Sequence, residues 1–280
     1  MSGIIDLHCH TTASDGELTA RELLRHAKKA GIATIGITDH DHVGAIDEAM
    51  EAGRALGVDV VPGVELSADL NGADVHILGY FINHHDPSLR EHLAFLRAQR
   101  LQRAERIVKK LNALQVPLRL EAVLEQAGGG SVGRPHIASA LVDEGLAESY
   151  QEAFLRYIGN GKPAYEQKYR VSPRQVFETI AAAGGLAFIA HPGTTLDEQS
   201  LLALLHDGVD GIEVIHPSHS PERVAFYRAI VDRHSLLASG GSDFHGGNKN
   251  DADALGRFGI TADNLAMIRS RLGRNRLRTR

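Results

Sequence analysis

Two hydrophobic patterns take turns along the chain. Short apolar runs, typical of buried strands, alternate with longer segments in which apolar residues recur every three or four positions, as on one face of a helix. The short runs predict strands at residues 4–7, 33–38, 58–65, 75–81, 186–190, 211–215 and 236–239. The longer segments predict helices at residues 17–31, 43–56, 173–183, 201–206, 222–233 and 262–272. Such alternation through short loops predicts an α/β protein with a parallel sheet or barrel.

The middle of the chain breaks this alternation. Between residue 87 and about residue 164, no segment has the pattern of a strand. Helical spacing covers residues 93–114, 118–126, 135–144 and 150–158 instead. We therefore expect an all-helical insertion at residues 91–164 that forms a cap, and one α/β unit built from residues 1–90 and 165–280. An insertion of this size is within the range of a small domain.

Composition excludes several classes of protein. The chain has 280 residues, 43% of them hydrophobic and 23% charged, as in ordinary soluble proteins. Its net charge of −5 gives no general attraction to nucleic acid. A single cysteine excludes an internal disulfide framework, and the chain shows neither a signal peptide nor an apolar stretch that could cross a membrane. We expect a cytoplasmic protein without membrane contact. The anomaly is the 16 histidines.

The first strand carries two of these histidines. His8 and His10 are two residues apart, so both imidazoles point to one face of the strand while Cys9 points to the other. Asp15 follows after a small polar turn. Two converging imidazoles and a nearby carboxylate form half of a metal site.

The other half is expected at the ends of the later strands. In βα barrels the strands end on one side of the molecule, so residues that follow different strands meet there. Histidines and carboxylates recur at nearly every such position, which favours a shared metal site over isolated hydrogen-bonded histidines. The candidate ligands are His8, His10, Asp15, His40, Glu65, His76, His191, Asp243 and His245.

This set is larger than one ion requires, since a catalytic zinc typically keeps three protein ligands. We therefore expect two or three divalent ions, with the central Glu65 bridging two of them. Imidazole and carboxylate ligands without a thiolate indicate Mn²⁺, with Fe²⁺ or Zn²⁺ as alternatives. Asp39 and Asp41 flank His40 and are interpreted as supporting or solvated groups.

These motifs resemble the PHP (polymerase and histidinol phosphatase) superfamily, in order and over the whole chain outside the insertion. The matching segments are His8-Cys9-His10 with Asp15, Thr38-Asp39-His40-Asp41, Glu65, His76, Ala190-His191-Pro192 and Ser242-Asp243-Phe244-His245. The insertion and Gly133-Arg134-Pro135-His136 resemble the branch that contains the 3′,5′-nucleoside bisphosphate phosphatases.

The resemblance implies a distorted (β/α)₇ barrel with a trinuclear metal site. The first ion would be held by His8, His10, Glu65 and Asp243. The second would be held by Glu65, His76 and His191, and the third by Asp15, His40 and His245. Some members of the superfamily carry a histidine where this chain has Asp15, which affects the choice of the third metal.

A site of this kind suits phosphoester hydrolysis. Two cations hold a hydroxide between them, direct it at phosphorus and neutralise the developing charge, so no nucleophilic serine or cysteine is required. Cys9 is interpreted as a small buried residue. His216 follows a predicted strand, where it either protonates the leaving oxygen or is an ordinary hydrogen-bonded histidine.

The insertion is expected to bind the substrate. Arginines at every third position from residue 97 to 106 lie along one helix flank, either as a solvated face or, for Arg100 and Arg103, as phosphate ligands. A glycine-rich loop leads into Pro135 at a helix start, and helix N-termini bind anions. Lys162 either closes over the phosphate or lies in a surface turn. The candidate contacts are Arg100, Arg103, Ser131, Arg134, His136 and Lys162.

One phosphate on the metals and another on the insertion require a small nucleotide with two phosphates. The predicted activity removes the 3′-phosphate from nucleoside 3′,5′-bisphosphates to give the 5′-monophosphate. The alternatives are 5′→3′ exonuclease activity on short RNA or DNA oligonucleotides and histidinol-phosphate phosphatase activity. A regulatory or metal-storing PHP module is the alternative outside enzymes.

The basic C-terminus, residues 269–280, either favours nucleic acid or is a solvated tail. The sequence leaves the oligomeric state open.

Overall fold

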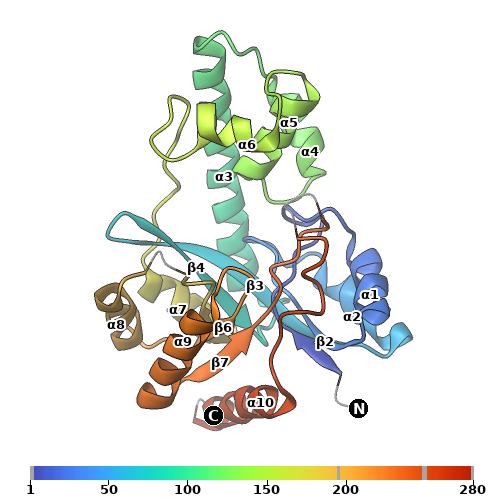
Figure 1. The fold of residues 1–280 in the computed structure, drawn as a ribbon, viewed down its shortest axis with the longest axis vertical. Helices are drawn as coiled ribbons and strands as arrows, with labels where there is room; N and C mark the ends of the chain where they lie inside the picture. Colours follow the sequence, from blue (N-terminus) through green and yellow to red (C-terminus); the bar gives the residue numbers. More distant parts are fainter. Residues whose placement is uncertain (1–2, 194–195, 248–250, 279–280) are drawn as a thin grey trace.

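A seven-stranded sheet forms the centre of the protein, and its strands follow one another in chain order. The computed structural model describes residues 3–193, 196–247 and 251–278. The strands are β1 (Ile4–Asp6), β2 (Ile32–Ile37), β3 (Asp59–Leu70), β4 (Ala73–Tyr80), β5 (Leu186–Ile189), β6 (Gly211–Ile215) and β7 (Leu237–Gly240). Helices cover the outside of the sheet, and a helical cap lies above one of its ends (Figure 1). The predicted α/β class is confirmed.

The outer helices begin where polar residues precede an apolar stripe. They are α1 (Ala20–Lys29), α2 (Ile46–Leu56), α7 (Pro173–Ala182), α8 (Glu198–His206), α9 (Pro221–His234) and α10 (Ala262–Arg278). Thr19 caps α1 in a capping box with Glu22, and Ser172 caps α7 in the same way with Gln175. These caps explain why the first predicted helix starts three residues later than its spacing suggested.

The sheet is not parallel throughout, contrary to the prediction. Strand β4 is antiparallel to both β3 and β5, whereas the other neighbouring strands are parallel. Asn71 and Gly72 form the two-residue turn between β3 and β4, with φ values of 54° and 90°. Such a loop can join only antiparallel strands, and Asn-Gly is its typical sequence. As a result β4 begins at the edge where β3 ends, and His76 lies at the mouth despite being near the start of its strand.

The sheet is an open one rather than a closed barrel, although its first and last strands approach each other. The Leu7 N–H donates to the Gly240 carbonyl at 3.1 Å, and Cys9 forms an isolated parallel bridge with Phe244. Helix α10 crosses the end of the sheet opposite the cap (Figure 1) and buries Ile268 against this region. The sequence predicted that α10 ends at residue 272, but the helix continues to Arg278.

The basic C-terminus is therefore largely helical. Arg269 lies 3.7 Å from Asp59, and Arg271 donates to the Ser235 carbonyl. The side chains of Arg276 and Arg278, and Arg280 as a whole, lie outside the described residues. Within the described part of the chain, no helix is long and apolar enough to cross a membrane.

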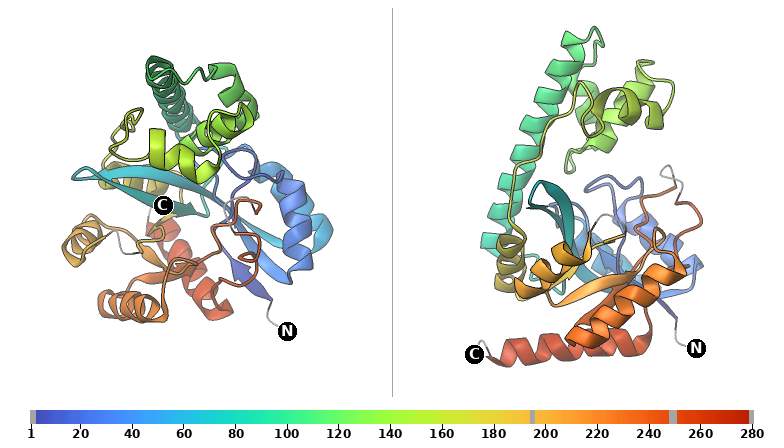
Figure 2. Two further views of the ribbon diagram at one scale, coloured as in Figure 1. Left: turned by 45° about the horizontal axis from the view of Figure 1, so that its top comes forward. Right: turned by 60° about the vertical axis from the view of Figure 1, so that its left-hand side comes forward.

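The cap is helical and has a core of its own. It contains α3 (Pro87–Ala113), α4 (Leu120–Ala127), α5 (Arg134–Asp143), α6 (Tyr150–Ala153) and the π-helix η1 (Phe154–Ile158). Figure 2 shows these helices standing over the mouth of the sheet. Ala153 and Ile158 are among its buried core residues. The described residues between 87 and 158 include no strand.

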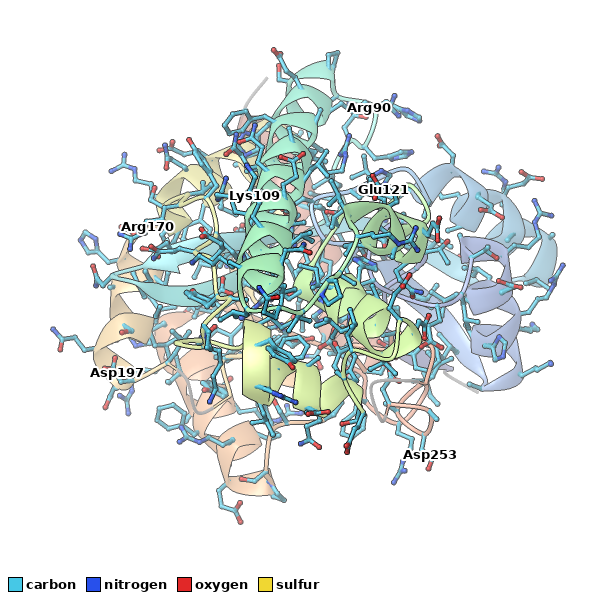
Figure 3. The ribbon with its side chains drawn as sticks, turned by 90° about the horizontal axis from the view of Figure 1, so that it is seen from above. Arg90, Lys109, Glu121, Arg170, Asp197 and Asp253 are labelled. Atoms are coloured by element: carbon cyan, nitrogen blue, oxygen red, sulfur yellow. The ribbon has the colours of Figure 1, made fainter. Side chains whose placement is uncertain are left out.

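Helix α3 belongs to two cores at once. It begins at Pro87, capped by Asp86, and its first apolar residues Leu89, Leu93 and Leu96 pack into the main core. Further along, residues from Ala104 to Leu111 pack into the core of the cap. The predicted boundary at residue 91 therefore falls inside a continuous helix. Figure 3 looks down on this helix from above the cap.

Candidate metal centre

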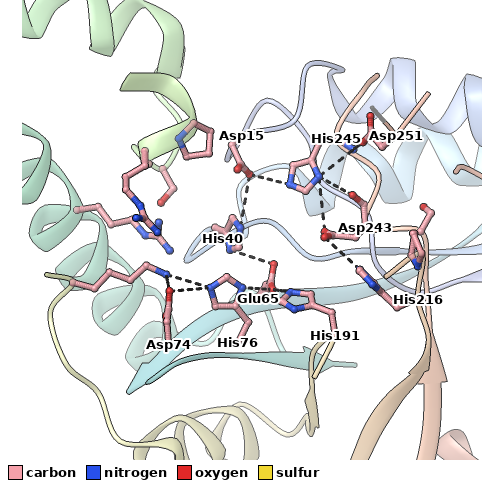
Figure 4. A pocket seen from close by; sticks show the side chains of 18 of the residues that line it. Asp15, His40, Glu65, Asp74, His76, His191, His216, Asp243, His245 and Asp251 are labelled. Carbon is pink, nitrogen blue, oxygen red and sulfur yellow. Dashed lines mark hydrogen bonds and ion pairs between the residues drawn. The ribbon is translucent and has the colours of Figure 1, made fainter. Parts of the chain in front are cut away.

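The predicted ligands gather at the end of the sheet that faces the cap, and Figure 4 labels all of them except His8 and His10. Their donor atoms form three groups, and within each group the atoms lie within 4.8 Å of one another. The groups are His8, His10, Glu65 and Asp243; His40, Glu65 and His76; and His10, Asp15, His40 and His245.

The first group is the most compact. The Nε2 atoms of His8 and His10 are 3.2 Å apart, and each lies 3.1–3.2 Å from Asp243 Oδ1. Glu65 Oε2 lies 3.4 Å and 3.2 Å from the same two nitrogens. Ligands about 2.1 Å from a common ion are roughly 3.0–3.5 Å from each other, so these four atoms have the spacing of a coordination shell.

Glu65 lies between this group and a second one. Its other oxygen, Oε1, is 2.9 Å from His76 Nδ1 and 3.0 Å from His191 Nε2. The side chain is only 1% exposed near the middle of β3. Oε2 thus faces His8 and His10 while Oε1 faces His76 and His191, which is the arrangement that a bridging carboxylate requires.

The third group surrounds Asp15. Its Oδ1 is 3.4 Å from His245 Nε2 and 3.9 Å from both His40 Nε2 and His10 Nδ1. His40 also directs its Nδ1 toward Glu65 Oε2 at 3.2 Å. His40 therefore stands between the second and third groups, whereas the resemblance placed it in the third alone.

Unused donor atoms show that this pocket fits metal ions. His40 Nδ1, His76 Nδ1 and His245 Nε2 are buried and make no hydrogen bond. Each nevertheless lies within 3.4 Å of a carboxylate oxygen, so nitrogen and oxygen face a common point rather than each other. Imidazole and carboxylate donors that converge in this way suit divalent transition metals.

The backbone is strained at two candidate ligands. His191 has a φ of 24° and Asp243 a φ of 51°, in the left-handed region that residues other than glycine avoid. Each follows closely on a strand, β5 and β7 respectively. Such conformations cost of order 1–3 kcal/mol each and cluster at functional sites, where the surrounding structure holds them.

Glu213 holds the ligands in place and was not predicted from the sequence. It points inward from β6 and is completely buried. Its Oε1 is 3.0 Å from His8 Nδ1, and its Oε2 accepts the His191 N–H at 2.6 Å. A carboxylate on the second ring nitrogen orients a histidine toward a metal. The sequence feature that could have revealed Glu213 is its position as the single charged residue inside an apolar strand.

Two carboxylates beside His40 also act as supports, as predicted. Asp39 accepts hydrogen bonds from the Thr11 N–H at 2.8 Å and from the Ser14 hydroxyl at 2.6 Å. It thereby holds the turn that carries Asp15. Asp41 forms an ion pair with Arg100 of α3 and so connects the cap to the metal ligands.

Protons occupy part of the site when metal is absent. Burial opposes a charge on His10, but hydrogen bonds to Asp243 and Glu65 raise its pKa to about 9. Burial also opposes a charge on His8, but the carboxylates of Glu213, Asp243 and Glu65 raise its pKa well above the ordinary value. At pH 7 the metal-free protein therefore keeps His10 protonated, and the surrounding carboxylates favour a proton on His8 as well.

We expect metal affinity to rise with pH. A cation must displace the proton on His10 and any proton on His8, so each released proton adds about a tenfold gain in affinity per pH unit below the raised pKa values. Titration calorimetry with Mn²⁺ at pH 7, in two buffers of different ionisation enthalpy, measures the released protons. One to two protons for the first ion are expected from these two residues, and release of none would contradict the assignment.

A cavity of about 520 Å³ lies between the metal ligands and the cap. The described cap side chains that line it are Arg100, Arg103, Ser131, Arg134, Pro135 and Phe154. His216, Pro217, Ser242, Asp251 and Ala254 line its opposite rim. The metal ligands and the candidate phosphate ligands therefore face the same space.

Two predicted substrate contacts lie outside this cavity. His136 is buried and its Nδ1 accepts the Gly133 N–H at 3.0 Å, so it stabilises the start of α5. Lys162 is exposed and does not line the cavity. Lys168, which the sequence analysis missed, does line it. Its Nζ is 2.6 Å from Asp74 Oδ2 and 3.2 Å from His76 Nε2.

Comparison with known proteins agrees with this geometry. The PHP domain family matches residues 6–161. The chain belongs to the PHP family. It is 38% identical to the 5′-3′ exoribonuclease Rnm of Escherichia coli over 86% of this chain and 85% of that protein. It is 35% identical to the 3′,5′-nucleoside bisphosphate phosphatase of Chromobacterium violaceum over 89% of this chain and 90% of that protein.

Solved structures lead to the same family. A Bifidobacterium adolescentis protein, described as a metal-dependent phosphoesterase, superposes with a TM-score of 0.87 at 34% identity, covering 94% of both chains. An amidohydrolase from Chromobacterium violaceum with bound sulfate gives a TM-score of 0.81 at 34% identity, covering 86% of this chain and 87% of that one. The PHP chain described here is therefore a hydrolase of the phosphoesterase type, and the resemblance inferred from its motifs is confirmed.

Proposed function

We propose that this PHP protein removes the 3′-phosphate from nucleoside 3′,5′-bisphosphates and leaves the 5′-monophosphate. The observation that carries the proposal is a cationic wall opposite the metal ligands, made of Arg103 and Arg134. Neither arginine lies within ion-pair distance of a carboxylate in the described part of the chain. Both line the 520 Å³ cavity.

Arg103, Arg134 and the neighbouring Ser131 are called the phosphate anchor here, and they offer hydrogen-bond donors to a ligand. Arg103 is 5% exposed and its Nε donates to the Glu166 carbonyl, which leaves its terminal nitrogens for a ligand. Burial and the nearby charges of Arg134 and Arg100 lower the pKa of Arg103 to about 10, so it remains a cation at pH 7. The Ser131 hydroxyl is buried at the same cavity without a hydrogen-bond partner. The oxygens of a bound phosphate are proposed to accept hydrogen bonds from these groups.

The nine ligands at the mouth would hold the metal ions, for which we propose Mn²⁺. When bound, such ions polarise the phosphoryl group and generate a nucleophile from water at neutral pH. The chain itself holds the second phosphate on Arg103 and Arg134, which fixes the nucleoside between the two ends of the cavity. Such positioning contributes to catalysis because the reacting groups no longer have to find one another.

His216 is proposed to stabilise the departing 3′ oxygen by donating a hydrogen bond to it. The Ser218 N–H donates to His216 Nδ1 at 3.1 Å. A backbone N–H can only donate, so Nδ1 is the acceptor and the ring proton is on Nε2. This Nε2 is buried, has no hydrogen-bond partner and lies 3.5 Å from Asp243 Oδ2 at the cavity. The oxygen released from the P–O3′ bond would accept a hydrogen bond from this Nε2–H, which stabilises its developing charge, and would take its proton from water.

We expect His216→Ala to lower kcat on the bisphosphate about 100-fold with little change in KM, because a hydrogen bond to the charge developing on the leaving oxygen is lost. The same variant should lose far less activity on 4-nitrophenyl phosphate, whose leaving group is a stable anion. His234→Ala, at the end of α9, is the matched control. Equal losses on both substrates would make His216 an ordinary structural histidine.

Exonuclease activity on short oligonucleotides is the second candidate, because the relatives with 38% and 36% identity are named 5′-3′ exoribonuclease Rnm. The same arginines would hold the 5′-phosphate of a terminal nucleotide, and the same P–O3′ bond would be cleaved. The basic residues of α10 lie at the end of the sheet opposite the cap (Figure 1), so they give no support to this candidate.

Phosphate and nucleotide release separates the candidates. Mn²⁺-loaded protein is tested on adenosine 3′,5′-bisphosphate, AMP, histidinol phosphate and a 5′-phosphorylated trinucleotide. Preference for the bisphosphate with 5′-AMP as product is expected. Preference for the trinucleotide would agree with a phosphate bound by the arginines but would make the enzyme an exonuclease. Preference for histidinol phosphate would contradict the proposal that the arginines bind a second phosphate.

A further inference from the structure

A second, smaller cavity lies behind the phosphate anchor. It has a volume of about 60 Å³ and is bordered by the β3–β4 hairpin and by residues 160–170, which return from the cap. Asp74, Arg103, Arg134 and Lys168 line both this side cavity and the main one, so the two spaces meet at these side chains. Because long side chains and not backbone form this partition, their cationic groups can donate hydrogen bonds to a ligand in either cavity.

The side cavity carries an excess of positive charge. Arg170 joins the three shared cations in its lining, and Asp69 and Asp74 are its two carboxylates. Asp74 is paired with Lys168 at 2.6 Å, and Asp69 lies 3.6 Å from Arg170 Nε. Arg103 and Arg134 remain without a carboxylate, which leaves the cavity attractive to an anion.

Arg134 is held at the centre of the partition. Its Nη1 donates to Asn160 Oδ1 at 2.8 Å. Its guanidinium lies 5.7 Å from the centre of the Phe154 ring and 5.8 Å from that of Tyr165. Phe154 lines the main cavity and Tyr165 the side cavity. The guanidinium is therefore fixed between the two spaces, and it can bind an oxygen on either side.

We propose that the side cavity is a subsite for a second phosphate at the 5′ end of the substrate. This inference rests on the proposed function, in which the partition binds the first 5′-phosphate from the main cavity. A volume of about 60 Å³ is several times the roughly 10–15 Å³ that one water needs, so it accommodates a phosphate group. The protein then accepts nucleosides with a 3′-phosphate and a 5′-diphosphate, and the 3′-phosphate is still the one removed.

Steady-state kinetics on two substrates test the subsite. The substrates are adenosine 3′-phosphate 5′-phosphate and adenosine 3′-phosphate 5′-diphosphate. For the wild-type protein, KM for the 5′-diphosphate is expected to be equal to or below that for the 5′-monophosphate. Arg170→Ala should raise KM for the 5′-diphosphate about tenfold more than KM for the 5′-monophosphate, because a charge-assisted contact to the outer phosphate is lost.

The control variant is Arg174→Ala, an exposed arginine that pairs with Glu178 and lies outside both cavities. It should leave the ratio of the two KM values unchanged. A wild-type KM for the 5′-diphosphate at least tenfold above that for the 5′-monophosphate, or an Arg170→Ala effect equal on both substrates, would overturn the subsite while leaving the proposed function intact.

A binding measurement separates failure of the subsite from failure of the proposed function. Titration calorimetry compares inorganic pyrophosphate with orthophosphate on the protein without added metal. Pyrophosphate is expected to bind at least about tenfold more tightly, and Arg170→Ala should reduce this advantage. Equal affinity for the two anions would overturn the subsite. The advantage would remain if the bisphosphate proved to be the wrong substrate.

Discussion

Glu65→Gln is expected to reduce kcat/KM on the bisphosphate at least roughly 1,000-fold and to remove two bound metal equivalents. The carboxylate directs one oxygen to His8 and His10 and the other to His76 and His191. An amide keeps the shape but offers one weak oxygen ligand and no charge, so neither ion retains a bridging partner. Metal content after dialysis, measured by mass spectrometry together with kcat/KM, checks both effects.

Glu213→Gln provides the matched control for this prediction. It makes the same change in an equally buried carboxylate, 1% exposed at Glu65 and 0% at Glu213. Because Glu213 supports His8 and His191 instead of facing the ions, the variant should keep its metal content at saturation. Metal affinity should fall about 10- to 100-fold. If both variants lost the same number of metal equivalents, Glu65 would not be a bridge.

The sequence was informative where local chemistry determines structure. Strand ends followed by His, Asp or Glu were visible as motifs, and every predicted helix and strand has a counterpart in the structure. The antiparallel β4 was missed although Asn71-Gly72 signalled a tight hairpin. The turn explains how His76, near the start of its strand, joins ligands that follow the ends of other strands.

Residues that act through distant partners could not be found in this way. Glu213 contacts His8 across 205 positions, and Lys168 contacts His76 across 92. The apolar strand around Glu213 signals a buried carboxylate but not its partner, and the sequence around Lys168 signals neither. The closed or open state of the sheet likewise depends on how β1 and β7 approach each other, which the pattern of each strand does not determine.

Helix α3 shows a pattern that could have been interpreted further. Its inward stripe runs through Leu89, Leu93, Leu96, Arg100, Arg103 and Ile107, at spacings of three and four. The two arginines thus occupy positions where an apolar residue would continue the stripe. They lie where α3 passes from the main core to the core of the cap. A charged pair on the buried face of a helix indicates a ligand or partner, since unpaired buried charges are costly.

Arg134→Ala is expected to raise KM for the bisphosphate about 10- to 100-fold, because a charge-assisted contact to phosphate contributes roughly 1.5–3 kcal/mol. Activity on a generic aryl phosphate, which reaches only the metal end of the cavity, should change little. Arg119→Ala tests for general effects on the cap, since Arg119 is exposed and pairs with Glu144. The melting temperature of each variant shows whether the cap remains folded.

The choice of two substrates makes this result specific to the anchor. If Arg134 acted on the metals or on the leaving group, both substrates would lose activity together. Damage to the cap alone would lower the melting temperature, with similar kinetic effects in Arg119→Ala. Only a residue that binds the phosphate remote from the reaction raises KM for the bisphosphate selectively. We propose Arg134 as that residue because it lines the same cavity as the metal ligands and forms no ion pair with a carboxylate among the described residues.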